Sequence, residues 1–241
     1  MPSYLQRVQL LYEAKNDIGL QNALVERCKE DPLFWFDWFA WTFNPRLDDA
    51  HLPFNLYPFQ RDVIEIMYDC ITRGEPLIIE KSRDMGLSWM VLLMFQWFWL
   101  FKDGADFLLG SRKEDEVDDK GNRSTLFEKF RYNLNRQPLW ICPKLARHHD
   151  GHMKIINPKN GNVLNGEAAT PDFGRSQRYR AALMDEVARH PYGELAYASV
   201  SQSTNCIILL FTPFGKANVA YKMRSHEGVK WIDIGESTCC I

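Results

Sequence analysis

EKSRDMGLSW, residues 80–89, is the stretch on which the interpretation of this chain depends. It compares with the phosphate-binding pattern G-x-x-x-x-G-K-[ST]. Aligned on Gly86 and Ser88, it keeps the last glycine and the hydroxyl, but Leu87 takes the lysine position and Lys81 takes that of the first glycine. Because a lysine at the start of the loop can reach across the same phosphates, the stretch is either a working variant or an ordinary strand, turn and helix with incidental charges.

The segments on either side of this loop have the character that the pattern requires. LIIE (77–80) predicts a short buried strand, and LSWMVLLMFQWFWLF (87–101) predicts an apolar helix. This helix falls short of the roughly 20 apolar residues that span a bilayer, so we expect it inside a core. Backbone N–H groups at the helix N-terminus would bind phosphate, and Arg83 adds a second positive charge. The cofactor-binding residues predicted in the loop are Lys81, Ser82, Arg83, Asp84, Met85, Gly86, Leu87 and Ser88.

A second candidate site is the acid pair in ALMDE (182–186), an apolar stretch typical of a strand end. Asp185 could hold Mg²⁺ through water, and Glu186 could orient or deprotonate an attacking water. Because strands often end in acids, the pair alone is weak evidence. Together with the loop, it predicts a P-loop ATPase that uses ATP and Mg²⁺, with Ser88 and Asp185 as metal ligands.

Two more polar residues extend the predicted site. Gln60, in YPFQ (57–60), offers both a donor and an acceptor to the adenine edge, and the alternative is a surface helix cap. Thr212, in FTPFG (211–215), could sense the γ-phosphate from a neighbouring strand, and the alternative is a strand terminator.

Strands and helices are predicted to alternate from residue 60 onward. The predicted strands are 77–80, 105–111, 180–186, 206–213 and 229–235, with a hairpin over 153–169. The predicted helices are 60–72, 87–101, 113–136 with a break at 120–122, 192–202 and 215–224. Such alternation implies an α/β fold with a mostly parallel sheet and helices on both faces. With the loop, the predicted fold class is a P-loop NTPase of the ASCE, RecA-like type, plus a small N-terminal helical segment.

The N-terminal part is predicted to be helical because Leu5, Val8, Leu11 and Tyr12 fall on one stripe. Residues 33–43 are also expected to form a helix, and 45–58 a loop. The predicted divisions are an aromatic-rich helical segment (1–45), an ATPase domain (46–236) and a tail or truncated linker (237–241).

Composition sets few further limits. The 241 residues are 46% hydrophobic and 25% charged, with a net charge of −2, which is typical of a globular protein with a substantial core. Any nucleic-acid contact must therefore come from a local basic patch. The six scattered cysteines favour reduced thiols in a cytosolic protein, and the charged N-terminus is no signal peptide.

In this order, these parts resemble the large terminase subunit of tailed bacteriophages, the motor ATPase that packages DNA into procapsids. The resemblance covers nearly the whole chain. It is carried by WTFNPR (41–46), LPFNLYPFQ (52–60), KSRDMGLS (81–88), GRSQRYRAALMDE (174–186) and LLFTPFG (209–215). The family's loop commonly has Ser-Arg at the positions of Ser82 and Arg83, and some members have the lysine at the loop's start. The resemblance therefore implies a working variant.

The resemblance also implies a role for each site residue. These roles are adenine contact for Gln60, phosphate and Mg²⁺ binding for Lys81, Arg83 and Ser88, the Walker B acid for Asp185, the catalytic acid for Glu186, and coupling of hydrolysis to movement for Thr212 and Pro213. Arg175 lies where an arginine finger is expected, although Arg178 and Arg180 leave that choice open. The catalytic set is thus Glu186, Arg83 and Arg175.

The partners implied by the resemblance are double-stranded DNA, the portal protein and the small terminase subunit. The working motor would be a homo-oligomeric ring, a pentamer, docked transiently on the procapsid in the host cytoplasm, without secretion or membrane contact, and the isolated domain could be a monomer. Family members usually continue into an RNase H-like nuclease domain. This chain ends at Ile241, so we expect an isolated ATPase domain or a truncated chain without nuclease activity.

Two alternatives remain open at the level of sequence. A superfamily 2 helicase-like ATPase also uses a glutamine before the loop and an Asp-Glu pair, but it needs a second RecA-like domain for which this chain has no room. A degenerate, non-hydrolysing nucleotide-binding or docking module would explain Leu87. Glu186 argues against it, because a pure binder has no use for an acid that activates water.

Overall fold

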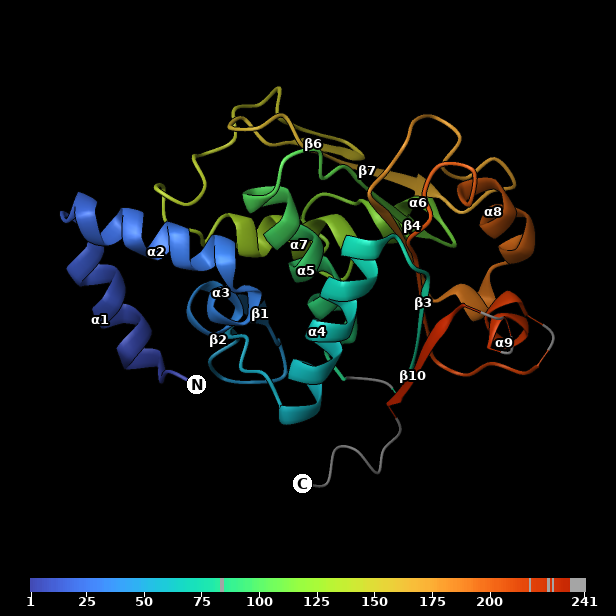
Figure 1. Cartoon of the computed structure of the whole chain (residues 1–241), viewed down its shortest axis with the longest axis horizontal. Helices are drawn as coiled ribbons and strands as arrows, with labels where there is room; N and C mark the ends of the chain where they lie inside the picture. The colour runs from blue at the N-terminus through green and yellow to red at the C-terminus, as the bar shows by residue number, and fades with distance from the viewer. Residues whose placement is uncertain (83–84, 217, 225, 227, 235–241) are drawn as a thin grey trace.

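An eight-stranded sheet organises the computed structural model, which describes residues 1–82, 85–216, 218–224, 226 and 228–234 (Figure 1). The strand order is β10-β3-β9-β8-β4-β7-β6-β5. The first six strands pair in parallel, and the last three form antiparallel pairs. The strands are β3 (Leu77–Lys81), β4 (Phe107–Ser111), β5 (Asp150–Gly151), β6 (Lys154–Ile156), β7 (Val163–Ala168), β8 (Ala181–Asp185), β9 (Ile207–Phe211) and β10 (Lys230–Ile234). The predicted mostly parallel sheet and the predicted 153–169 hairpin are confirmed.

Helices cover both faces of this sheet, as predicted, and each face has its own core (Figure 1). The larger core is built by α1 (Tyr4–Ala14), α2 (Ile18–Glu30), α3 (Pro32–Phe39), α4 (Pro58–Arg73), α5 (Leu87–Phe101), α6 (Glu114–Val117) and α7 (Leu126–Leu134). The smaller core is built by the 3-10 turn η1 (Val187–Arg189), α8 (Gly193–Val200) and α9 (Val219–Met223). The fold is an α/β, P-loop NTPase-like fold.

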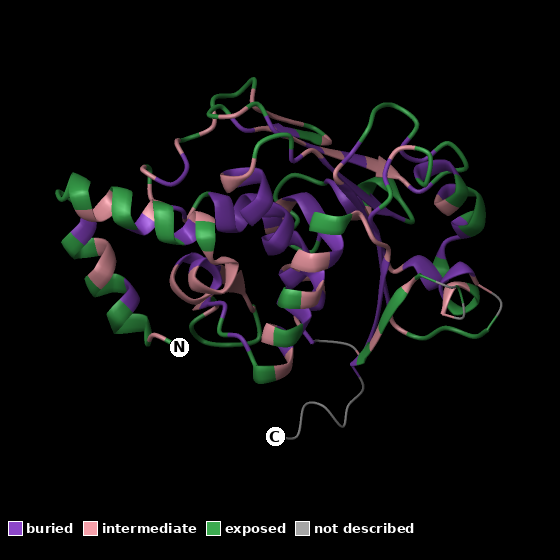
Figure 2. Cartoon of the chain, in the orientation of Figure 1, coloured by how far each residue is buried: buried purple, intermediate pink, exposed green. Residues whose placement is uncertain are grey.

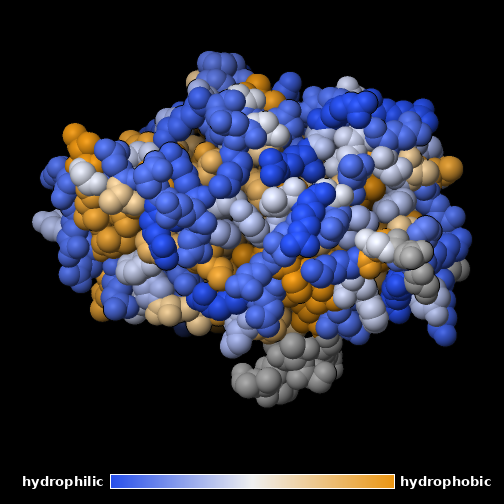
Figure 3. All heavy atoms as spheres, in the orientation of Figure 1, coloured by the Kyte–Doolittle hydropathy of each residue, from blue (hydrophilic) through white to orange (hydrophobic). Residues whose placement is uncertain are grey.

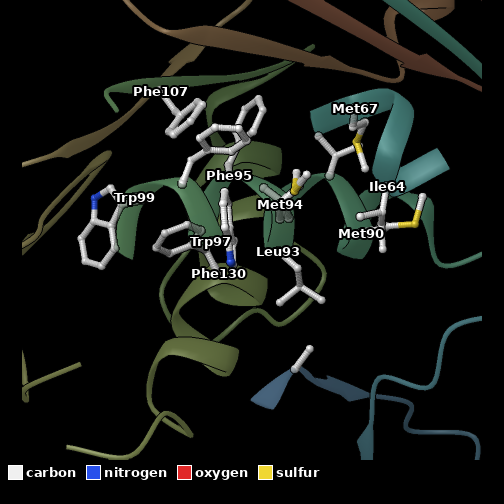
Figure 4. Close-up of a cluster of buried hydrophobic side chains, with 14 of the residues drawn as sticks. Ile64, Met67, Met90, Leu93, Met94, Phe95, Trp97, Trp99, Phe107 and Phe130 are labelled. Carbon is white, nitrogen blue, oxygen red and sulfur yellow. The ribbon is translucent and has the colours of Figure 1, made fainter. Parts of the chain in front are cut away.

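The central helix α5 is almost entirely buried, with only Ser88, Trp89 and Phe101 partly exposed. Trp97 and Trp99 are fully buried, and Phe95 stacks on Phe107 of β4 with ring centroids 4.3 Å apart (Figures 2 and 4). No helix among the described residues is long and apolar enough to cross a membrane. The apolar run is therefore explained by burial against the sheet on one side and by α4 and α7 on the others.

Three local features differ from the sequence-based expectations. Residues 41–43 and 51–53 form a small antiparallel hairpin, β1 (Trp41–Phe43) with β2 (His51–Pro53), where a helix end and a loop were expected. The break expected at 120–122 within 113–136 is present, but it extends over 118–125 and leaves two short helices, α6 and α7. Helix α9 begins only after Asn218, whose side chain accepts from the Tyr221 N–H. The Thr125 and Asn218 side chains cap the N-termini of α7 and α9, which sets where these two helices begin.

The N-terminal helix α1 turns an apolar stripe outward. Leu5 is 76% exposed and Tyr12 78% exposed, and apolar side chains gather over α1 and α2 on the face drawn in Figure 3. The residues that α1 buries are Ala14 and Arg7. Arg7 donates to the Ala40 carbonyl at 2.8 Å and to the Asn55 side chain at 3.2 Å. Burial lowers the pKa of Arg7 to about 10, and the negative charge of Asp37 partly offsets that fall. The stripe thus predicted the helix but not the side that packs.

A buried ion pair fixes α7 to its neighbours. Arg131 of α7 donates to both carboxylate oxygens of Asp118, at 2.6 and 3.0 Å, and also to Asp150 of β5 at 2.7 Å. The Asp118 side chain is fully buried. Burial acts to raise the pKa of Asp118, but hydrogen bonds from Arg131 and from the Met153 N–H outweigh it and hold that pKa below its usual value.

Replacing Asp118 with alanine is expected to lower the free energy of unfolding by about 3–5 kcal/mol, because it leaves a buried guanidinium without its main partner. Urea unfolding monitored by circular dichroism measures this. Asp69→Ala, which removes an exposed pair with Arg73, is the matched control and should cost about 0.5 kcal/mol or less. Since the Asp118 pKa is depressed, its contribution is present above the unfolded-state pKa and is lost as pH falls through the folded-state pKa. Equal losses in the two variants would contradict this account.

Candidate nucleotide and catalytic site

The predicted site residues meet at the carboxyl ends of three neighbouring strands. Lys81 ends β3, Asp185 ends β8, and Thr212 directly follows β9, which lies between them. The register places Phe211 beside Glu80 and Leu210 beside Asp185. Sites in parallel sheets form at this edge, so the topology brings together residues that are far apart in sequence.

Lys81 and Glu186 form an ion pair across this edge. The Lys81 Nζ lies 3.1 Å from the Glu186 Oε1, with the lysine side chain 10% exposed and the glutamate side chain 39% exposed. Glu186 has left-handed backbone angles, φ 52° and ψ 33°. A residue other than glycine pays roughly 1–3 kcal/mol for such a conformation, which concentrates at functional sites. The strained turn directs this acid toward Lys81 at the end of β3.

Ser88 and Asp185 form the predicted metal pair. The Ser88 hydroxyl donates to Asp185 Oδ2 at 3.4 Å, and the Glu186 N–H donates to Asp185 Oδ1 at 3.1 Å. Burial raises the pKa of Asp185, and the nearby charges of Lys129 and Lys81 oppose that rise. The described residues hold no cluster of three or more metal-ligating side chains. One hydroxyl and one carboxylate nevertheless fit Mg²⁺, which usually takes its other ligands from water and phosphate oxygens.

Gly86 and Gln60 shape the loop on the other side. Gly86 has φ +70° and precedes α5, and this left-handed conformation favours glycine. The buried Gln60 donates to the Met85 carbonyl at 3.0 Å and accepts from the Tyr57 N–H at 3.0 Å. Gln60 therefore holds the loop to the start of α4. Its amide keeps one further proton and one further lone pair, which leaves the adenine contact chemically open as a prediction.

The remaining loop residues divide into three groups. Leu87 is 1% exposed and packs in the core, so its side chain cannot face a phosphate and only its backbone can take part. The Ser82 N–H already donates to the Ile234 carbonyl at 3.2 Å, which leaves its hydroxyl. Arg83 and Asp84 lie outside the described residues.

Two cavities open at this site. A cleft of about 720 Å³ runs past Gln60, Met85, Gly86 and Trp89, a volume within the range of small-molecule sites. A smaller cavity of about 210 Å³ is lined by Arg112, Glu116, Glu186, Arg189 and Thr212. Gln60 and Gly86 thus line one cavity, and Glu186 and Thr212 line the other.

The three candidates for an arginine finger lie in different environments. Arg175 is exposed and pairs with Asp172 at 2.6 Å, while Arg178 is also exposed. Arg180 is half-buried, with its guanidinium 4.9 Å from the centroid of the Phe98 ring. Arg175 and Arg178 are therefore the candidates available to a neighbouring subunit.

Three basic residues at the site were missed at the level of sequence. Lys129 of α7 lines the larger cleft, and Arg112 and Arg189 line the smaller cavity. The Arg189 guanidinium lies 4.8 Å from the centroid of the Phe214 ring, just beyond Thr212. Arg112 directly follows a predicted strand, and Arg189 lies three residues after Glu186, which is a usable signal. Lys129 gives none, because it is one polar residue on an amphipathic helix.

Comparison with solved structures identifies the fold. The large terminase of bacteriophage HK97 matches with a TM-score of 0.59 and 14% identity, over 86% of this chain and 43% of that one. The large terminase ATPase domain of Thermus phage P74-26 matches with a TM-score of 0.51 and 14% identity, over 75% of this chain and 81% of that one. The large terminase of a thermophilic bacteriophage, solved with ADP, matches with a TM-score of 0.51 and 13% identity, over 75% of this chain and 45% of that one.

These matches show that the chain has the fold of phage large terminase ATPase domains. The chain spans less than half the length of the HK97 protein. No family model matches the sequence, and no curated protein matches it.

Proposed function

We propose that this chain is the ATP-hydrolysing motor domain of a phage large terminase, which drives double-stranded DNA into a procapsid. The observation that carries the proposal is the meeting of Lys81, Ser88, Asp185 and Glu186 at adjacent strand ends. The proposal is supported by the fold, which this chain shares with large terminase ATPase domains, and by the ADP complex of one large terminase.

The chain's own residues suggest the order of events. Ser88 and Asp185 would hold Mg²⁺. The bound ion would partly neutralise the charge of the ATP triphosphate. A phosphate at the loop would compete with Glu186 for the Lys81 ammonium, because both are anions within reach of one cation. The released carboxylate can then accept a proton from water as a general base. Thr212 lines the same cavity as Glu186 and would contact the attacking water or the γ-phosphate.

The proposal extends to the partners of the motor. Double-stranded DNA, a portal protein and a small terminase subunit would be the contacts of a homo-oligomeric ring of this chain. A finger from the neighbouring subunit, with Arg175 as the first candidate, would complete each site.

Replacing Glu186 with glutamine tests the proposed chemistry. ATP binding should persist, because the amide keeps the side chain's shape, while hydrolysis should fall by roughly 10²–10⁴-fold with the loss of the base. Equilibrium ATP binding and phosphate release, each with and without Mg²⁺, measure the two effects. Glu194→Gln, at an exposed acid that pairs with Lys222, is the matched control.

Each outcome of this experiment has a distinct meaning. Parallel loss of Mg²⁺-dependent binding and rate in Glu186→Gln would place Glu186 among the metal ligands instead. Failure of the wild-type chain to bind ATP, or unchanged hydrolysis in Glu186→Gln, would overturn the proposal.

A further inference from the structure

Helix α7 brings a lysine to the nucleotide cleft from outside the phosphate loop. Lys129 lines the cleft of about 720 Å³ together with Gln60, Gly86 and Trp89. Trp89, in the first turn of α5, packs against Tyr132 of α7 with ring centroids 5.6 Å apart. Because Tyr132 lies one turn after Lys129 on the same helix, this contact sets the lysine against the start of α5.

The position of α7 is rigidly determined. Arg131, two residues after Lys129, binds Asp118 and Asp150, and Asn133 and Gln137 bond to residues of α3, α5 and β1. The backbone that carries Lys129 is thus held from both sides. A lysine on such a helix has only its own side-chain torsions to adjust when it meets a ligand.

The electrostatic surroundings of Lys129 suit an anion. Its side chain is half-buried, yet no carboxylate of the described residues lies within ion-pair distance of it. Burial lowers the pKa of its ammonium, and the charges that act on it are those of Asp185, Lys81 and Glu186. Lys81 is paired with Glu186, whereas Lys129 retains its hydrogen-bonding capacity toward the cleft.

We infer that Lys129 binds the β- and γ-phosphates of the nucleotide and supplies the second lysine that the loop lacks at Leu87. The inference rests on the proposed function. Leu87 is buried in the core, so the loop's own helix cannot present a cation at that position. Lys129 reaches the same region from α7, across the start of α5, while Lys81 reaches it from β3.

The test compares nucleotides of different phosphate number. Equilibrium affinities for ATP, ADP and AMP are measured with Mg²⁺ and with a chelator, for the wild-type chain, Lys129→Ala, Lys129→Arg and the control Lys144→Ala. Lys144 is an exposed lysine away from the cleft. We expect Lys129→Ala to weaken the affinity for ATP and ADP by roughly 10–100-fold, the range of one hydrogen bond to a charged group. The affinity for AMP should not change. Lys129→Arg should retain most of the affinity.

The outcomes separate this inference from the proposed function. A wild-type chain that binds no ATP overturns both. If the wild-type chain binds ATP and Lys129→Ala binds it equally well, the inference alone is overturned. An equal loss of affinity for AMP, or a matching fall in melting temperature in Lys129→Ala, would show that Lys129 stabilises the structure of the cleft rather than binding phosphates. Either result would also overturn the inference.

Discussion

Lys81→Ala is expected to reduce ATP hydrolysis to background and to weaken ATP binding sharply, with the fold intact. Lys81 is the last residue of β3 and is the loop cation that the structure places at the site, 3.1 Å from Glu186. Alanine there removes the charge that would hold the phosphates. It also leaves Glu186 free to repel the incoming triphosphate, so the loss in affinity should exceed that of a single contact.

Phosphate-release kinetics and equilibrium ATP binding measure these two losses, and circular dichroism checks the fold. Lys120→Ala is a suitable control, because Lys120 is an exposed loop lysine whose amine donates to the Asp150 carbonyl. In Lys81→Ala/Glu186→Gln, part of the lost affinity should return, since the repelling carboxylate is gone. Wild-type turnover in Lys81→Ala would show that this stretch is an ordinary strand, turn and helix with incidental charges.

Arg175→Ala is expected to lower hydrolysis by roughly 10³–10⁵-fold in the assembled motor, the range seen for arginine fingers. ATP binding by a single chain should not change. Arg175 is 61% exposed, and its partner Asp172 is more exposed still, so the guanidinium can leave that pair at little cost. A cation that arrives only when subunits are correctly apposed would link hydrolysis to assembly.

Mixing two inactive variants tests transfer between subunits. A Lys81→Ala subunit can lend its intact Arg175 to the intact pocket of an Arg175→Ala neighbour, so mixed rings should recover part of the hydrolysis. Arg178→Ala, at the other exposed candidate, serves as the comparison. Absence of rescue in verified mixed rings, or lost ATP binding by an isolated Arg175→Ala chain, would count against Arg175 and move the assignment to Arg178.

Local sequence patterns were enough to predict the sheet and the site residues that lie next to its strands. Short apolar strands and the helix 87–101 have strong signals, and their alternation leaves few topologies. Lys81, Ser88, Asp185 and Glu186 were predicted because each belongs to a short motif next to a strand. The hairpin of β1 and β2 was not predicted, since strands of three residues are too short to show a period.

Features set by contacts between distant segments could not be predicted. The stripe with Leu5 and Tyr12 indicated a helix, but Arg7 decides which side packs, through bonds to Ala40 and Asn55. Lys129 is likewise placed by the docking of α7 on α5. Such placement depends on tertiary packing, which no spacing within α7 records.

The left-handed backbone at residue 186 has a consequence for how this chain can evolve. Glycine and asparagine accept φ 52° more readily than glutamate does. Either would relieve about 1 kcal/mol or more of strain, and either would remove the carboxylate. A library screened only for folding would therefore drift away from glutamate at this position, and only selection for turnover retains it. Under the proposed function, the most stable members of such a library would bind ATP without hydrolysing it.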